Sequence, residues 1–176
     1  MSPLTDTENN LPDSFNQIYN HLLFPAGFSL SSPPCRENES RDYEAIQFCL
    51  NGKLILFRQA KITPRKIGQF VTLWKRPFPD AEIMPFEPED NIDFCLIATF
   101  SGDKKGFFLF DSDILIKKGI FASETNDGKR AIRVYPSWDL PNSKQAIQTQ
   151  KWQSSYFINF NNPLPMIKQF KDILNK

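Results

Sequence analysis

The stretch YEAIQFCLNGKLILFRQAKI, residues 43–62, carries the clearest fold signal in the chain. Two runs with alternating apolar residues flank Asn51-Gly52, the typical sequence of a two-residue β-hairpin turn. The pattern therefore predicts strands over 43–50 and 53–62. A two-residue turn places Leu50 opposite Lys53, and the same register continued along the hairpin pairs Glu44 with Gln59 and Asp42 with Lys61.

This register gives the hairpin one mostly apolar face whose far end is polar. Two carboxylates, an amide oxygen and an ammonium group there suit a weak Mg²⁺ site. We predict Asp42, Glu44 and Gln59 as metal ligands, with Lys61 orienting a metal-bound water or stabilising charge on a phosphoryl group. The alternatives are a solvated cross-strand pair and a one-residue bulge that changes the register.

The rest of the chain predicts helices on both sides of a mixed sheet. Thr63-Pro64 resembles a helix start, and Ile67, Phe70, Val71 and Trp74 fall at helical spacing, so a helix is predicted after the hairpin, with its N-terminal amides near 63–66. The other predicted elements are helices over 13–24, 143–157 and from 162 onward, and strands over 94–100, 106–110 and 130–135. We expect an α/β (α+β) fold with a flexible leader, residues 1–12, and one domain, residues 13–176.

Charge is unevenly distributed along the sequence. Lys and Arg total 21 and Asp and Glu total 20, a formal net charge of +1, which argues against a uniformly basic nucleic-acid coat. Residues 45–79 nevertheless contain basic residues and no acid. This window predicts a local anion site, with nucleic acid as one candidate partner. The predicted ligand-binding residues are Arg58, Thr63, Arg65, Lys66, Gln69, Lys75, Arg76, Arg133 and Tyr135.

Composition excludes several other functions. The single histidine, His21, excludes a zinc site with two or more histidines. Three cysteines without a Cys-x-x-Cys pair are typical of a reducing compartment. We identify no signal peptide, membrane-spanning run or glycine-rich nucleotide loop, and we expect a soluble, cytoplasmic protein.

Three stretches resemble the MepB-like protein family. They are FRQAKITPRKIGQFVTLWKR at 57–76, RVYPxWD at 133–139 and TQxWQxxYF at 149–157. The resemblance runs from about residue 14 to residue 157. It implies kinship without a biochemical activity, because none is assigned to the family.

A more distant resemblance is to the PD-(D/E)xK nuclease superfamily, with its restriction-endonuclease-like core. Its order of helix, hairpin with an acid on the first strand and (D/E)xK on the second, then helix, is similar to the predicted elements around Glu44 and Gln59-Ala60-Lys61. The resemblance implies Mg²⁺-dependent phosphodiester hydrolysis. Gln59 replaces the second acid, which weakens metal affinity, and Arg41 precedes Asp42 where the family has proline.

Two alternative functions that involve no catalysis stay open. In the first, the protein is a binding or regulatory protein that uses the same basic groove. In the second, it is an adaptor that works through the aromatic region 133–152. In that region the tryptophans Trp138 and Trp152 either line a pocket or close the core.

Overall fold

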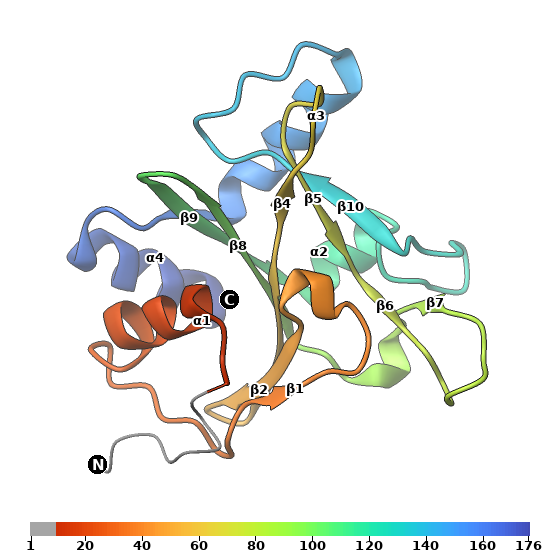
Figure 1. Cartoon of the computed structure of the whole chain (residues 1–176), viewed down its shortest axis with the longest axis horizontal. Helices are drawn as coiled ribbons and strands as arrows, with labels where there is room; N and C mark the ends of the chain where they lie inside the picture. Colours follow the sequence, from red (N-terminus) through yellow and green to blue (C-terminus); the bar gives the residue numbers. More distant parts are fainter. Residues whose placement is uncertain (1–9) are drawn as a thin grey trace.

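A computed structural model describes residues 10–176 of the chain (Figure 1). Its main sheet has six strands in the order β1-β2-β3-β8-β9-β11, and two smaller sheets have the orders β10-β5-β4 and β6-β7. In the main sheet β3 and β8 are parallel and the other neighbours are antiparallel. The predicted mixed α+β fold is confirmed. The strands are β1 (Cys35–Arg36), β2 (Ile46–Leu50), β3 (Lys53–Gln59), β4 (Lys61–Ile62), β5 (Gln69–Thr72), β6 (Trp74–Lys75), β7 (Met84–Pro85), β8 (Phe94–Ser101), β9 (Lys104–Asp111), β10 (Ala131–Val134) and β11 (Phe157–Asn159).

The helices flank this sheet. They are α1 (Asp13–Ile18), the π-helix η1 (Tyr19–Leu23), α2 (Ser112–Lys117), α3 (Lys144–Gln153) and α4 (Pro163–Leu174), with 3-10 turns η2 (Arg41–Tyr43), η3 (Pro88–Asp90) and η4 (Ser154–Tyr156). The predicted leader lies mostly outside the described residues. Of its last residues, Leu11 packs against the core and the Asn10 carbonyl accepts hydrogen bonds from Arg36. No helix within residues 10–176 has the length and apolar character needed to cross a membrane.

The hairpin between β2 and β3 forms in the predicted register near its turn. Leu50 pairs with Lys53, and the pairing continues to Ile46 opposite Phe57. Asn51 and Gly52 both have positive φ, 49° and 77°, as the favoured two-residue hairpin turn requires.

The far end of the hairpin differs from the prediction. The first strand begins at Ile46, and residues 41–43 form the turn η2. Glu44 has a φ of 52°, a left-handed conformation that cannot continue a strand. The predicted pairings of Glu44 with Gln59 and of Asp42 with Lys61 are therefore wrong, and Gln59 pairs with Ala98 of β8 instead.

The helix predicted after Thr63-Pro64 is also wrong. Residues 61–75 form β4, β5 and β6, and β5 pairs with both β4 and β10. Arg65 and Gly68 have positive φ, 65° and 83°, so the chain turns where a helix would begin. Val71 and Leu73 are fully buried and both pack in the hydrophobic cluster that this part of the chain covers.

The main sheet separates two hydrophobic clusters. Along β3, Ile55 and Phe57 face one cluster and Leu56 faces the other, and β8 and β9 alternate in the same way. The first cluster is covered by α1, η1 and α4, and the second by the β10-β5-β4 sheet, α2 and α3 (Figure 1). The central strands are thus buried on both faces, as their apolar runs predict.

Candidate nucleic-acid interface

The predicted metal ligands at the end of the hairpin have other partners. The Glu44 carboxylate forms an ion pair with Arg36. Gln59 Oε1 accepts a hydrogen bond of 2.7 Å from Ser14 Oγ on α1. Asp42 is exposed on η2. Each of these groups thus has another partner or is exposed, and the His, Cys, Asp and Glu side chains of residues 10–176 form no group of three that could hold a metal.

Lys61, the predicted catalytic lysine, lies on the short strand β4. Its Nζ is 5.0 Å from the centroid of the Tyr43 ring, a cation–π contact. Tyr43 precedes Glu44 in the chain, but the hairpin pairing that the sequence predicts for Glu44 and Gln59 does not form.

Arg58 belongs to the interior. Its side chain is fully buried and forms an ion pair with Glu37, whose side chain is 12% exposed. Its guanidinium also donates hydrogen bonds to the carbonyls of Thr72, at 3.2 Å, and Phe57, at 2.9 Å. Arg58 therefore ties β3 to β5 and to the segment before β2, and a ligand on the surface cannot reach it.

The last two basic residues of the window are also neutralised. Lys75 Nζ lies 2.8 Å from carboxylate oxygens of both Glu87 and Asp90. Arg76 Nε lies 2.8 Å from Glu39 Oε1, and hydrogen bonds from Arg76 and Trp74 lower the pKa of Glu39. All these acids lie outside residues 45–79, so the acid-free window in the sequence is not an acid-free surface in the fold.

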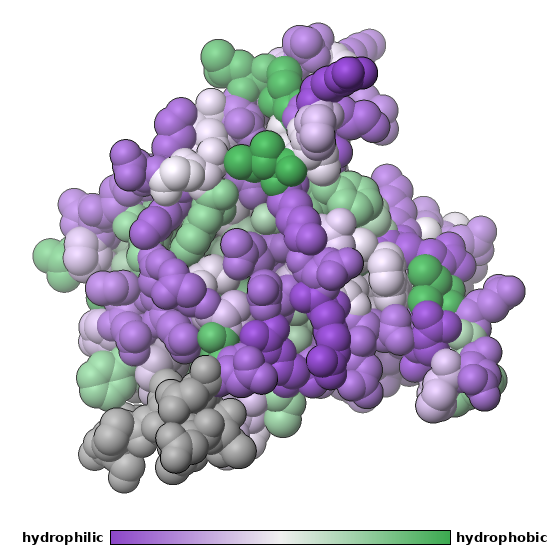
Figure 2. Space-filling model, in the orientation of Figure 1, coloured by the Kyte–Doolittle hydropathy of each residue, from purple (hydrophilic) through white to green (hydrophobic). Residues whose placement is uncertain are grey.

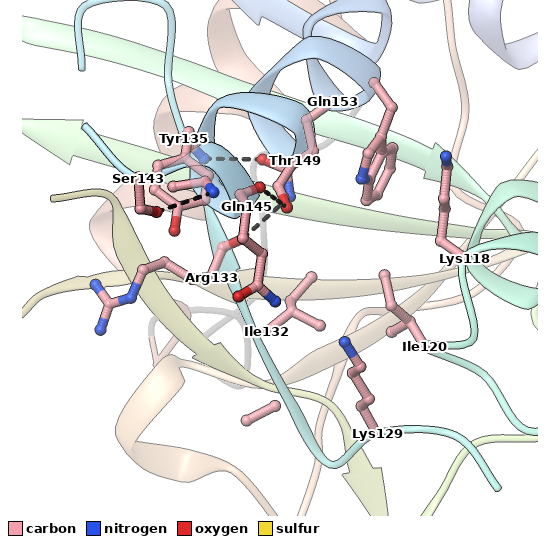
Figure 3. A pocket seen from close by; sticks show the side chains of 13 residues that line it. Lys118, Ile120, Lys129, Ile132, Arg133, Tyr135, Ser143, Gln145, Thr149 and Gln153 are labelled. Carbon is pink, nitrogen blue, oxygen red and sulfur yellow. Dashed lines mark hydrogen bonds between the residues drawn. The ribbon is translucent and has the colours of Figure 1, made fainter. Parts of the chain in front are cut away.

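A different surface collects basic side chains without acids. A hollow of about 410 Å³ lies between β10, α3 and the end of α2, and Lys118 and Lys129 line it. Figure 3 shows these two lysines on one side of the hollow, with α3 and Gln145 beside it. Its lining residues include no Asp or Glu.

The first turn of α3 adds to the positive potential of this hollow. The helix is capped by Ser143, whose Oγ accepts a hydrogen bond from the backbone N–H of Ala146. Both residues line the hollow. The N-terminal end of a helix carries a partial positive charge, which favours an anionic ligand.

A second hollow extends this surface toward β4 and β5. It shares Arg133, Tyr135, Ser143 and Ala146 with the first and adds Arg65 and Lys66, again without an acid. Among residues 10–176, no acidic side chain forms a salt bridge with any basic residue of the two hollows. We call these residues the basic groove: Arg65, Lys66, Lys118, Lys129 and Arg133.

Arg133 lines both hollows of the basic groove and is bonded to the segment between β4 and β5. Its guanidinium donates hydrogen bonds to Thr63 Oγ1, at 2.9 Å, and to the Gly68 carbonyl, at 3.1 Å, and lies 5.9 Å from the Phe70 ring centroid. The predicted residues Thr63, Arg65, Lys66, Gln69, Arg133 and Tyr135 thus meet at one end of the molecule. Lys118 and Lys129 were missed, because each lies in a sequence segment of mixed charge and only the fold brings them to α3.

The fold and the groove together define an α+β protein with a central mixed sheet and a basic hollow against one helix. The chain belongs to the MepB-like family, whose pattern matches residues 37–159. It is similar to the crystal structure of MepB, with 38% sequence identity and a TM-score of 0.70, over 73% of this chain and 86% of that one.

A weaker similarity is to a bacterial homing endonuclease. That structure has 12% sequence identity and a TM-score of 0.46, over 84% of this chain and 91% of the endonuclease. No curated protein matches the sequence.

Proposed function

We propose that this protein binds nucleic acid through its basic groove. One observation carries the proposal: two hollows that share Arg133 and Tyr135 are lined by five basic residues and no acid, around the N-terminal end of α3. Phosphate oxygens are the groups that such an arrangement attracts, through lysine and arginine side chains and backbone N–H groups. This function corresponds to the non-catalytic alternative, a binding or regulatory protein. Its binding surface differs from the one that the basic residues of 45–79 predict.

Fluorescence anisotropy with a labelled single-stranded oligonucleotide tests this function. The double variant Lys118→Gln/Lys129→Gln removes two charges from the groove, and Lys168→Gln/Lys171→Gln, at two exposed positions on α4, is the charge-matched control. We expect the double variant to weaken binding about tenfold at low salt, and the control to leave it unchanged.

Salt dependence gives an independent readout. Each phosphate contact to a single strand adds about −0.7 to the slope of log affinity against log salt, so two lost contacts flatten the slope by about 1.4. Parent-like affinity and slope in the double variant would exclude the groove as the phosphate site.

Mg²⁺-dependent phosphodiester hydrolysis is a second candidate, supported by the contact of Lys61 with Tyr43, the residue that precedes Glu44 in the chain. In this proposal Glu44, with Asp42, and Gln59 bind the metal and Lys61 orients water. Glu44 must then leave Arg36, and Gln59 must leave Ser14. Cleavage of DNA and RNA with Mg²⁺ or Mn²⁺ is compared with that of Lys61→Ala, and equal rates would remove Lys61 from the reaction.

We further propose a reducing, cytoplasmic location. The support is chemical: Cys35, Cys49 and Cys95 are all free thiols in the fold.

A further inference from the structure

A cavity of about 450 Å³ lies next to the basic groove, within the range of roughly 300–1,000 Å³ that is typical of small-molecule sites. The loop between β4 and β5, the turn between β8 and β9, and the loop after β10 form its walls, at the upper end of the molecule in Figure 1. Lys66 and Ile67 line both this cavity and the groove. A ligand in the cavity would therefore be adjacent to bound phosphates.

One residue in the wall of this cavity carries an unsatisfied buried acceptor. Gln69 is 2% exposed, and its Oε1 atom has no hydrogen-bond partner among the described residues. A buried amide oxygen without a donor costs about 1–3 kcal/mol, so such atoms are rare unless a ligand or water supplies the donor. Gln69 lines the cavity, so a turn of its amide toward the cavity would let a donor on a bound ligand satisfy this oxygen.

The other lining groups favour a flat, partly apolar ligand. Trp138 lines the cavity, and its ring meets Phe157 edge-on at 5.6 Å between centroids. The rim carries the exposed apolar side chains Ile62, Ile67 and Leu140. Figure 2 shows hydrophobic residues gathered at this end of the molecule. Aromatic side chains of this kind are stacking platforms for unpaired bases.

Asp139 is the one acidic residue in the cavity lining, beside Lys66 and Lys104. Its carboxylate can accept hydrogen bonds from a neutral donor on a ligand. Burial raises the pKa of Asp139, while the positive charge of Lys104 opposes this shift. The cavity thus offers two acceptors, Gln69 Oε1 and the Asp139 carboxylate, with an aromatic ring beside them.

We propose that this cavity binds one unpaired nucleobase that carries an exocyclic amino group, such as cytosine or adenine, of a single strand whose phosphates lie in the basic groove. The proposal rests on the proposed function and deepens it. An amino group has two hydrogens to donate to the two acceptors, whereas thymine offers only its ring N–H. Lys66, shared by the cavity and the groove, then lies where base and phosphate meet.

The test compares oligo(dC) and oligo(dT) of equal length by fluorescence anisotropy. We expect the parent to bind oligo(dC) about tenfold more tightly, since about 1.4 kcal/mol of hydrogen bonding is a factor of ten. Gln69→Met removes the acceptor at nearly constant shape and should abolish most of this preference by weakening oligo(dC) binding more than oligo(dT) binding. Gln148→Met, exposed on α3, is the matched control and should keep the preference.

A measurement of stability distinguishes the loss of a ligand contact in Gln69→Met from damage to the fold. Because Gln69→Met removes an unsatisfied buried acceptor, its urea midpoint should equal or exceed that of the parent. If it falls, Asp139→Leu, which removes the acceptor of the other wall, provides the same comparison. Equal binding of both oligonucleotides by the parent would overturn this inference alone, whereas binding of neither would overturn the proposed function as well.

Discussion

At the scale of single residues, the ion pair between Arg58 and Glu37 gives the sharpest stability prediction. Arg58 is fully buried, so removing its partner leaves a charge in the interior. We expect Glu37→Ala to lower the free energy of unfolding by about 3–5 kcal/mol. Replacing both partners by apolar residues, Arg58→Met/Glu37→Leu, should cost less than Glu37→Ala alone. Urea denaturation measures both, and a loss below about 1 kcal/mol in Glu37→Ala would show that Arg58 does not need this partner.

A second prediction at this scale concerns Cys95, a buried thiol on β8. Burial raises its pKa to about 12 from the ordinary value of 9.0. In the unfolded chain the thiol loses its proton near the lower value, so the unfolded state binds fewer protons between the two values and stability falls as pH rises through this window. We expect the urea midpoint to drop between about pH 8 and pH 10.5, and to drop less in Cys95→Ala.

Thiol reactivity provides the complementary measurement. Cys35 is exposed and Cys95 is fully buried, so a thiol reagent should modify Cys35 in the native protein and reach Cys95 only after denaturation. Fast native modification of Cys95 would contradict the buried assignment.

At the scale of elements, Gln153 joins α3 to the exposed edge of β10. Its Oε1 accepts a hydrogen bond of 2.9 Å from the Tyr135 N–H, and its Nε2 donates one of 3.0 Å to the Arg133 carbonyl. The side chain thus makes the two backbone hydrogen bonds that a neighbouring strand would otherwise make. It also fixes α3, and with it the groove, against the sheet.

Gln153→Leu should therefore destabilise the protein by about 2 kcal/mol or more, because two backbone groups lose their partners. The matched control Gln148→Leu lies exposed on the same helix and should change stability by less than about 0.5 kcal/mol. Thermal unfolding followed by circular dichroism distinguishes them, and similar midpoints for the two variants would contradict the bridging role.

The sequence predicts the elements whose signals are local. Asn51-Gly52 determines the hairpin register, and the apolar runs at 94–100 and 106–110 correspond to buried strands. Residues 63–76 were mispredicted because Ile67, Phe70 and Trp74 happen to fall at helical spacing, whereas the partner that makes β5 a strand is β10, far away in the chain. Tertiary pairing overrides a local pattern in such a segment.

The candidate site, too, was predicted from the sequence only in part. The sequence locates Arg65, Lys66 and Arg133, but it misses the acids that neutralise Lys75 and Arg76, since Glu39, Glu87 and Asp90 lie outside the basic window. The orphaned oxygen of Gln69 has no counterpart in the sequence at all, because only packing decides which polar atoms lose water.

At the scale of the whole molecule, the two hydrophobic clusters share one sheet, so neither can unfold without exposing the other's strands. Phe170 of α4 is fully buried in the cluster beneath α1, and Trp152 packs on the cluster of the opposite face. Phe170→Ala should cost about 3–5 kcal/mol through lost packing. Because β3, β8 and β9 contribute side chains to both clusters, the loss must reach the far face.

Tryptophan fluorescence and far-ultraviolet circular dichroism should therefore report one shifted midpoint for Phe170→Ala in urea. Leu164→Ala is the control: Leu164 is on the same helix, but it is 79% exposed and should change the midpoint little. If the fluorescence midpoint stayed at the parent value while the dichroism midpoint fell, the two faces would unfold separately. The groove, built on the second face, would then be independent of the helices that cover the first.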